Sequence, residues 1–162
     1  MCDDCQIGTY STAVGAATSS TCIYCDIGKY SSTSGASSMC LGCPARSSTC
    51  VPGLCTAGSD ALSDCTCNSG SSGPDGGPCT ICTAGTYTIY PGSAACDPCV
   101  SGKYSTTEGA KKSTVCLSCP FQSSSPSGSH ARSECTCNIG YYCCANKGGD
   151  CQECPAGKFR NS

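Results

Sequence analysis

Pairs of cysteines at the spacing Cys-x-x-Cys recur seven times along this chain, and five of the pairs are followed, two residues on, by Gly, any residue and an aromatic. Two cysteines at this spacing can form disulfides, bind zinc as thiolates or act as a redox pair. The repetition predicts a tandem repeat held together by sulfur. The pairs are Cys2/Cys5, Cys22/Cys25, Cys40/Cys43, Cys79/Cys82, Cys96/Cys99, Cys116/Cys119 and Cys151/Cys154.

Disulfides fit these cysteines better than zinc or redox chemistry does. Zinc takes four thiolates from two such pairs. However, the single-residue spacing in Cys65-Thr66-Cys67 and the Gly-x-aromatic that follows many of the pairs favour nested disulfides. A thioredoxin-like redox pair needs a surrounding βαβ unit, and helix signals are absent from the chain. We therefore expect no metal and no cofactor.

The cysteine content and the scarcity of aliphatic residues limit how the chain can fold. Cysteine makes up 22 of the 162 residues, above the level typical of a disulfide scaffold, and such scaffolds require an oxidising compartment. Leu, Ile, Val and Phe together make up about a tenth of the residues, too few for a sizeable hydrophobic core. We expect an extracellular or cell-surface protein that is ordered locally, loop by loop.

The charged residues indicate neither a nucleic-acid nor a membrane partner. The formal net charge is -2, and Lys and Arg are scattered without forming a basic stripe. No stretch approaches the ~20 apolar residues of a membrane span, and the first residues lack the pattern of a signal peptide. Because the chain starts inside a Cys-x-x-Cys pair and stops just after a new repeat begins, we interpret it as a fragment whose export is directed from outside this segment.

Two kinds of repeat alternate along the chain. The simple kind runs from a cysteine through Gly-x-aromatic and a Ser/Thr-rich turn to the next cysteine pair, and this pattern is typical of a hairpin between two short strands. The longer kind contains Cys-Thr-Cys-Asn. Together they predict a small disulfide-rich fold: an elongated tandem array of short β-hairpin modules with little helix and no common hydrophobic core.

The segment 99–142 carries Cys-x-x-Gly-Lys-Tyr-Ser, Cys-Leu-Ser-Cys-Pro and Cys-Thr-Cys-Asn-Ile-Gly-Tyr-Tyr in that order. It resembles the cysteine-rich, EGF-like region of Eph receptors and the ephrin-receptor-like, GCC2/GCC3-type repeats of extracellular proteins, and it is more distantly similar to tumour-necrosis-factor-receptor modules. The resemblance covers nearly the whole chain. It departs at an extra pair, Cys50 and Cys55, and at Cys143-Cys144.

The resemblance implies five segments. They are 1–42 with two simple repeats, 43–81 with an EGF-like unit and the extra cysteine pair, 82–118 with two simple repeats, 119–153 with an EGF-like unit, and 154–162 as the start of the next repeat.

The resemblance also implies a disulfide pairing that the sequence alone does not select from its many alternatives. The implied bonds are Cys5–Cys22, Cys25–Cys40, Cys43–Cys65, Cys67–Cys79, Cys82–Cys96, Cys99–Cys116, Cys119–Cys135 and Cys137–Cys151. We expect the extra pair, Cys50 and Cys55, to close a small loop of its own. Cys2 and Cys154 then need partners outside the segment. For Cys143 and Cys144 we favour a strained vicinal disulfide over division between two neighbouring loops or an intermolecular bond.

Five aromatic residues occupy equivalent positions after the Gly of their repeats: Tyr10, Tyr30, Tyr87, Tyr104 and Phe159. We expect each ring to pack on the disulfide of its unit and so to replace part of a core. The preceding glycine can take positive φ, which lets the chain turn sharply after the cysteine.

No residue pattern indicates catalysis. His130, the single histidine, lies in a Ser/Gly-rich loop without the partners of a catalytic triad, and the acidic residues show no paired-carboxylate or calcium-loop spacing. We expect no enzyme. No Asn fits the N-glycosylation rule, whereas the Ser/Thr-rich turns suit O-linked glycans.

These expectations favour an extracellular structural repeat protein: a segment of a surface coat, stalk or filament subunit whose partners are neighbouring copies or other surface proteins. The alternative is the stalk or ligand-binding part of a receptor ectodomain of the Eph or tumour-necrosis-factor-receptor type. A third class, a secreted protease inhibitor, has only the loop between Cys50 and Cys55 as a weak candidate. If each of about six links advances the chain by ~17 Å, the segment spans roughly 100 Å.

Overall fold

The computed structural model describes every residue of the chain except 1, 51–54, 56, 144–147 and 160–162. Within the described residues, the regular structure consists of sixteen two-residue strands and four 3-10 turns, without an α-helix. The strands pair into eight two-stranded sheets, each made of two consecutive strands. This confirms a small disulfide-rich fold of short hairpins with little helix.

The strands are β1 (Thr9–Tyr10), β2 (Ile23–Tyr24), β3 (Lys29–Tyr30), β4 (Leu41–Gly42), β5 (Ser47–Ser48), β6 (Thr66–Cys67), β7 (Ser71–Ser72), β8 (Thr80–Ile81), β9 (Thr86–Tyr87), β10 (Asp97–Pro98), β11 (Lys103–Tyr104), β12 (Leu117–Ser118), β13 (Ser123–Ser124), β14 (Thr136–Cys137), β15 (Tyr141–Tyr142) and β16 (Gln152–Glu153). The 3-10 turns are η1 (Ser19–Thr21), η2 (Leu62–Asp64), η3 (Ser113–Val115) and η4 (Arg132–Glu134).

One disulfide closes each hairpin at the same place. In the first hairpin, β1 begins four residues after Cys5, and β2 begins directly after its partner Cys22. The other seven hairpins keep the same offsets. We number them as modules 1 to 8 by their disulfides: Cys5–Cys22, Cys25–Cys40, Cys43–Cys65, Cys67–Cys79, Cys82–Cys96, Cys99–Cys116, Cys119–Cys135 and Cys137–Cys151. A ninth disulfide, Cys50–Cys55, lies within the loop of module 3.

A tight turn leads from each first half-cystine into the first strand. In module 1, the amide of Thr9 donates to the carbonyl oxygen of Gln6 (3.1 Å), and Gly8 between them has φ of 79°. A positive φ at the third of the four turn residues is the requirement of a type II turn, and glycine meets it without strain. Seven further turns carry the same bond: Lys29 to Asp26, Ser47 to Pro44, Ser71 to Asn68, Thr86 to Thr83, Lys103 to Val100, Ser123 to Pro120 and Tyr141 to Asn138.

Modules 3 and 7 place a larger residue at this turn position. Arg46 has φ of 65° and Gln122 has φ of 56°, and among the described residues no other non-glycine residue has positive φ. The left-handed conformation costs a residue with a Cβ atom about 1 kcal/mol or more. The two longer units predicted from the sequence therefore each begin with a strained turn.

Replacing Arg46 by glycine is expected to stabilise module 3. Glycine adopts positive φ freely, so the substitution removes a strain of about 1 kcal/mol. The amide of Ser47, which donates to Pro44 across the turn at 3.1 Å, should then exchange with solvent about fivefold more slowly, as measured by NMR.

Two matched variants separate backbone strain from the loss of charge. Arg46→Ala removes the guanidinium but keeps the Cβ atom, so the exchange rate should not change. Gly28→Ala introduces strain at the equivalent position of module 2, where the new Cβ would meet only Ser48 Oγ at 3.8 Å, and it should accelerate exchange at Lys29. If Arg46→Gly and Arg46→Ala had equal effects, strain would not be the cause.

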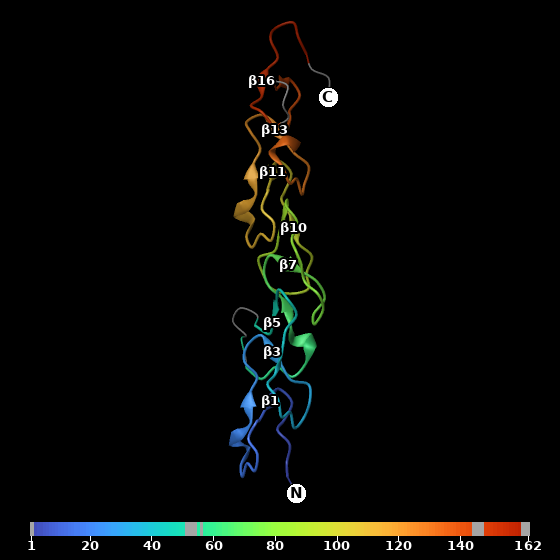
Figure 1. The fold of residues 1–162 in the computed structure, drawn as a ribbon. Helices are drawn as coiled ribbons and strands as arrows, with labels where there is room; N and C mark the ends of the chain where they lie inside the picture. Colours follow the sequence, from blue (N-terminus) through green and yellow to red (C-terminus); the bar gives the residue numbers. More distant parts are fainter. Residues whose placement is uncertain (1, 51–54, 56, 144–147, 160–162) are drawn as a thin grey trace. The chain divides into compact units, whose positions relative to one another are not determined.

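The chain forms two compact units: Met1–Thr80 with Tyr90–Ala95, and Ile81–Ile89 with Cys96–Ser162. Within the first unit, strands β1, β3, β5 and β7 succeed one another in chain order, from blue to green in Figure 1. Within the second unit, strands β11, β13 and β16 also follow one another in chain order. Each unit is thus a series of hairpins.

Sulfur and small hydroxyl side chains fill the interior of these units. In the part of the chain that the structure describes, the buried apolar side chains are Ala110 and seven half-cystines: Cys25, Cys65, Cys67, Cys79, Cys82, Cys99 and Cys135. Many large aliphatic side chains are exposed instead, such as Ile23 and Leu117 in the second strands of their hairpins. The described residues therefore contain no common hydrophobic core, as the composition predicted.

Candidate functional site: the joints between modules

Successive modules are connected by main-chain hydrogen bonds, and we call the set between two modules a joint. Three such bonds connect modules 1 and 2: Gly8 N–H to Ser31 O (2.8 Å), Ser11 N–H to Ala36 O (3.0 Å) and Gly35 N–H to Cys5 O (2.8 Å). One donor comes from the turn glycine, one from the residue after the first strand and one from the glycine in the middle of the next loop. All three bonds join main-chain atoms.

The same three bonds recur in the second unit at equivalent positions. Between modules 5 and 6 they are Gly85 N–H to Ser105 O (2.7 Å), Thr88 N–H to Ala110 O (3.0 Å) and Gly109 N–H to Cys82 O (2.7 Å). Between modules 6 and 7 they are Gly102 N–H to Ser125 O (2.8 Å), Ser105 N–H to Ser129 O (3.1 Å) and Gly128 N–H to Cys99 O (2.8 Å). The same joint geometry therefore occurs between modules 1 and 2, 5 and 6, and 6 and 7.

The joint between modules 2 and 3 differs in one bond. Ser31 N–H donates to Ser59 O (3.1 Å), and Gly58 N–H donates to Cys25 O (2.8 Å), as elsewhere. The amide of Gly28, however, donates to the side-chain Oγ1 of Thr49 at 2.8 Å. A threonine hydroxyl thus takes the place of a main-chain carbonyl in the module that carries the additional disulfide.

The first turn of a module also touches the module after next. A Cβ atom added to Gly8 would overlap the carbonyl oxygen of Gly58, and one added to Gly85 would overlap that of Gly128. Only glycine allows two main chains to approach this closely. The turn glycine therefore serves both the type II turn and the packing between modules.

Each Cys-Thr-Cys-Asn sequence connects two successive modules, as a Cys-x-x-Cys pair does elsewhere, but with one residue instead of two between the half-cystines. In module 1, the amide that donates to the turn residue Gly8 belongs to Cys25, at 2.9 Å. In modules 3 and 7 the equivalent donors are Asn68, to Arg46 O, and Asn138, to Gln122 O, both at 2.8 Å. Each longer unit of the sequence accordingly contains two hairpin modules.

Small hydroxyl residues line the joints, and the sequence analysis did not identify them. They lie six residues after the first half-cystine, and their exposed fractions are 7% or less: Ser31, Thr49, Thr88, Ser105 and Ser125. A larger side chain would separate the main chains that bond at the joint. The sequence signal was the Ser or Thr that follows the first strand in six of the eight modules.

The four predicted tyrosines lie in equivalent first strands, and each is half-buried. Three of them are paired across the hairpin with an exposed aliphatic residue: Tyr10 with Ile23, Tyr30 with Leu41 and Tyr104 with Leu117. Such aromatic–aliphatic pairs stabilise two-stranded sheets. Phe159 is 82% exposed. Packing of the rings on the disulfides remains a prediction.

Among the described residues, eight of the nine disulfides join the same cysteines as the pairing that the resemblance implies, and the ninth joins the extra pair, Cys50 and Cys55. Each Cys-x-x-Cys from Cys22/Cys25 to Cys116/Cys119 supplies the last half-cystine of one module and the first of the next. Cys2 and Cys154 have no disulfide partner within the described residues. The predicted bond between Cys143 and Cys144 lies outside the described residues because it involves position 144.

His130 takes part in a local hydrogen-bond network. Oε1 of Glu134 accepts the amides of His130 (3.1 Å) and Ala131 (3.0 Å), and it lies 2.9 Å from the imidazole Nδ1. Desolvation on its own would raise the pKa of the Glu134 carboxyl, but these amides, the imidazole and the Ser129 hydroxyl together hold that pKa below its ordinary value. The carboxylate thus fixes the loop before Cys135.

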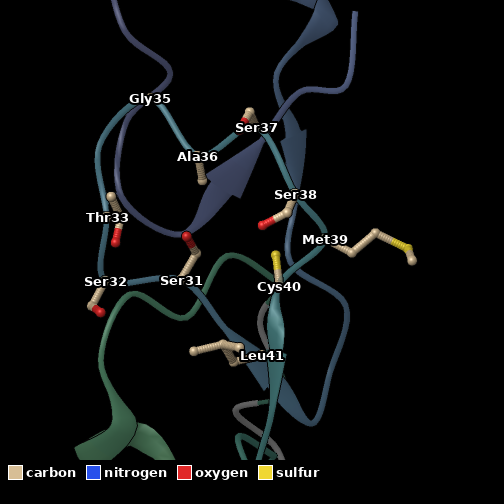
Figure 2. A pocket seen from close by; sticks show the side chains of 10 residues that line it. All are labelled: Ser31, Ser32, Thr33, Gly35, Ala36, Ser37, Ser38, Met39, Cys40 and Leu41. Atoms are coloured by element: carbon tan, nitrogen blue, oxygen red, sulfur yellow. The ribbon is translucent and has the colours of Figure 1, made fainter.

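One open hollow lies within the loop of module 2 (Figure 2). Its lining is Ser31, Ser32, Thr33, Gly35, Ala36, Ser37, Ser38, Met39, Cys40 and Leu41. Met39 points away from the loop and is 69% exposed. The lining contains hydroxyl groups but no carboxylate, imidazole, amine or guanidinium, so it offers no acid–base pair for catalysis.

The described part of the chain contains no group of three or more His, Cys, Asp or Glu side chains placed to hold a metal ion. Nor does it contain a helix long and apolar enough to cross a membrane. The fold defines a disulfide-rich array of hairpin modules. Comparison with protein-family models and with curated proteins finds no match to this chain.

Proposed function

We propose that the chain is an extracellular structural repeat, a segment of a surface coat, stalk or filament subunit that performs no catalysis. The observation that supports this best is the recurrence of one joint, made of the same three main-chain bonds, between modules 1 and 2, 5 and 6, and 6 and 7. Arrays whose repeats contact only near neighbours serve as extended supports and surfaces. Because the hydrogen bonds of the joint use main-chain atoms, the exposed loop residues other than its glycines and small hydroxyl residues can change without altering it.

The chemistry of the chain suits the outside of a cell. Nine disulfides persist in an oxidising compartment and are rare in the cytosol. The exposed Ser and Thr residues of the loops are suited to O-linked glycans, and the modules resemble ephrin-receptor-like repeats. Neighbouring copies or other surface proteins are the partners that this proposal requires.

Small-angle scattering of the oxidised chain tests the proposal. For a support that spans roughly 100 Å we expect a radius of gyration near ~29 Å, whereas a compact domain of this size would give ~15 Å. The unreduced monomer, isolated by size-exclusion chromatography, is the sample. A value near the compact figure would mean that the modules fold back on one another and would rule out the stalk or filament.

A further inference from the structure

Two lysines are adjacent in the loop of module 6. Lys111 and Lys112 are exposed, and neither side chain takes part in an ion pair or a hydrogen bond within the described residues. Lys112 has an extended main chain, with φ of -158° and ψ of 148°. Exposed loops are where proteinases cut folded chains, and a serine proteinase of the trypsin type binds such a basic side chain in an acidic pocket. The lysine pair therefore has the charge and the exposure of a proteinase substrate.

The other basic residues between positions 2 and 143 lie in regular elements. Lys29 and Lys103 belong to the first strands β3 and β11, Arg46 occupies the turn before β5, and Arg132 lies in η4. To bind a proteinase at any of these residues, the chain must first open the hairpin or the turn around it. The lysine pair needs a smaller opening.

In modules 3 and 7, a carboxylate fixes the two residues that correspond to the lysines. Oε1 of Glu134 accepts the amides of His130 (3.1 Å) and Ala131 (3.0 Å). Oδ2 of Asp64 accepts the two equivalent amides of module 3, both at 3.1 Å. Module 6 has Val115 at this place, and no side chain caps its 3-10 turn. The lysine pair is therefore not held by a carboxylate.

The main chain around the lysines is also weakly bonded. The amide of Val115 lies 3.5 Å from Lys112 O, whereas the equivalent amide of Glu134 lies 3.1 Å from Ala131 O. An N–H···O bond is ordinarily no longer than about 3.2 Å. The 3-10 turn η3 that follows Lys112 is therefore easier to open than η4.

The following module covers the loop in module 7 and leaves it uncovered in module 6. A Cβ atom added to Gly148 of module 8 would overlap Arg132 O, so module 8 packs against η4. A Cβ atom added to Gly128 of module 7 would meet Pro98 at 3.6 Å and no atom of η3. The peptide bond after Arg132 is thus shielded, and the bond after Lys112 is accessible.

We propose that the peptide bond between Lys112 and Ser113 is a processing site, which an extracellular serine proteinase that cuts after lysine hydrolyses in the folded protein. The C–N bond breaks, and water supplies a hydroxyl group to the Lys112 carbon and a hydrogen to the Ser113 nitrogen. The bond after Lys111 is a poorer substrate because the preceding Ala110 is buried, and its carbonyl oxygen accepts the amide of Thr88 (3.0 Å). This inference goes beyond the proposed structural function and does not require it.

Hydrolysis at this bond divides the chain without dispersing it. Of the nine disulfides of the described residues, only Cys99–Cys116 spans the bond. Strands β11 and β12 lie on opposite sides of the cut and are paired with each other. A thiol that reduces this one disulfide then allows residues 113–162 to separate from residues 1–112. The site is thus a release point within the series of modules.

Limited digestion with trypsin tests the site. The first product should be heavier than the intact chain by one water, and it should give residues 1–112 and 113–162 only after reduction. Lys112→Gln should abolish this product, whereas Lys111→Gln should leave it. The sample is the oxidised chain with its last three basic residues neutralised by Lys147→Gln, Lys158→Gln and Arg160→Gln.

Three results of the digestion would overturn the inference. The first is a cut after Arg132, Lys29 or Lys103 that is as fast as the cut after Lys112. The second is a chain that is cut only after its disulfides are reduced. The third is loss of the product in Lys111→Gln. Hydrogen exchange at the amide of Gly109, which donates to Cys82 O (2.7 Å), checks that module 6 is folded in each variant.

An exchange of the carboxylate tests why this bond is accessible. When a loop opens and closes faster than it is cut, the rate of cleavage follows the population of the open loop. Val115→Glu should therefore slow the cut after Lys112 about tenfold, and Glu134→Ala should accelerate the cut after Arg132 by a similar factor. Val115→Leu is the matched control and should leave the rate unchanged. Equal rates in Val115→Glu and Val115→Leu would show that the carboxylate does not protect these loops.

Discussion

Complete reduction of the disulfides is expected to unfold the whole chain in water without added denaturant. Among the described residues, the buried apolar side chains are half-cystines and a single alanine, Ala110, so reduction leaves almost nothing to hold the loops together. A hairpin with two-residue strands is not stable alone. Reduction followed by alkylation should therefore abolish protection of the amides from hydrogen exchange. This includes the amides of Cys25 and Cys119, which close hairpins by donating to Gly8 O (2.9 Å) and Gly102 O (2.8 Å).

The size of this effect follows from loop closure. The eight module disulfides close loops with sequence separations from 12 to 22 residues, and each contributes about 3 kcal/mol in the chain-entropy description. Together they exceed the stability of an ordinary domain of similar length. Alkylation without reduction is the control and should leave exchange unchanged. Protection that survived reduction would show a core that the burial of side chains does not reveal.

Much of the fold could be predicted from the spacing of cysteine and glycine. A half-cystine followed three residues later by glycine specifies a turn into a strand, because only glycine adopts positive φ freely. Gly8 and Gly102 show this directly, with φ of 79° each. The short hairpins follow from the regular return to a second half-cystine.

The strained turns could not be predicted in the same way. Arg46 and Gln122 occupy the glycine position of the repeat with φ of 65° and 56°, although neither residue favours that conformation. The disulfides and hydrogen bonds on both sides impose it. Local preference therefore fails where the repeated geometry is stronger.

The joints were also not predicted, because main-chain hydrogen bonds leave little trace in side-chain types. The buried hydroxyl residues did leave a trace. Ser105 is fully buried, and its amide and carbonyl oxygen both take part in joints. A search for a core among aliphatic residues passes over serine, which is mostly exposed in proteins. In a chain without a core, a small residue at a fixed distance from cysteine is the informative signal.

Removal of one module disulfide should loosen its own module and spare distant ones. In the double variant Cys99→Ala and Cys116→Ala, we expect amide protection within module 6 to fall about 100-fold, the factor that corresponds to a loop-closure contribution of about 3 kcal/mol. Residue-resolved hydrogen exchange by NMR is the measurement. Protection should also fall, by less, at the amides that bond directly to module 6, such as those of Gly85 and Gly128.

The distant modules provide the decisive comparison. The amides of Gly35 and Gly58 donate hydrogen bonds at joints within the first unit, and these bonds involve no atom of module 6. The exchange rates of these two amides should therefore not change.

The double variant Cys50→Ala and Cys55→Ala is the matched control. The Cys50–Cys55 disulfide closes a loop with a sequence separation of 5, and its loss should lower the stability of module 3 alone by about 2 kcal/mol. If protection fell along the whole chain after loss of the Cys99–Cys116 bond, the modules would share one cooperative structure. Stability is local only when each module is held by the next one or two modules and by none farther along the chain.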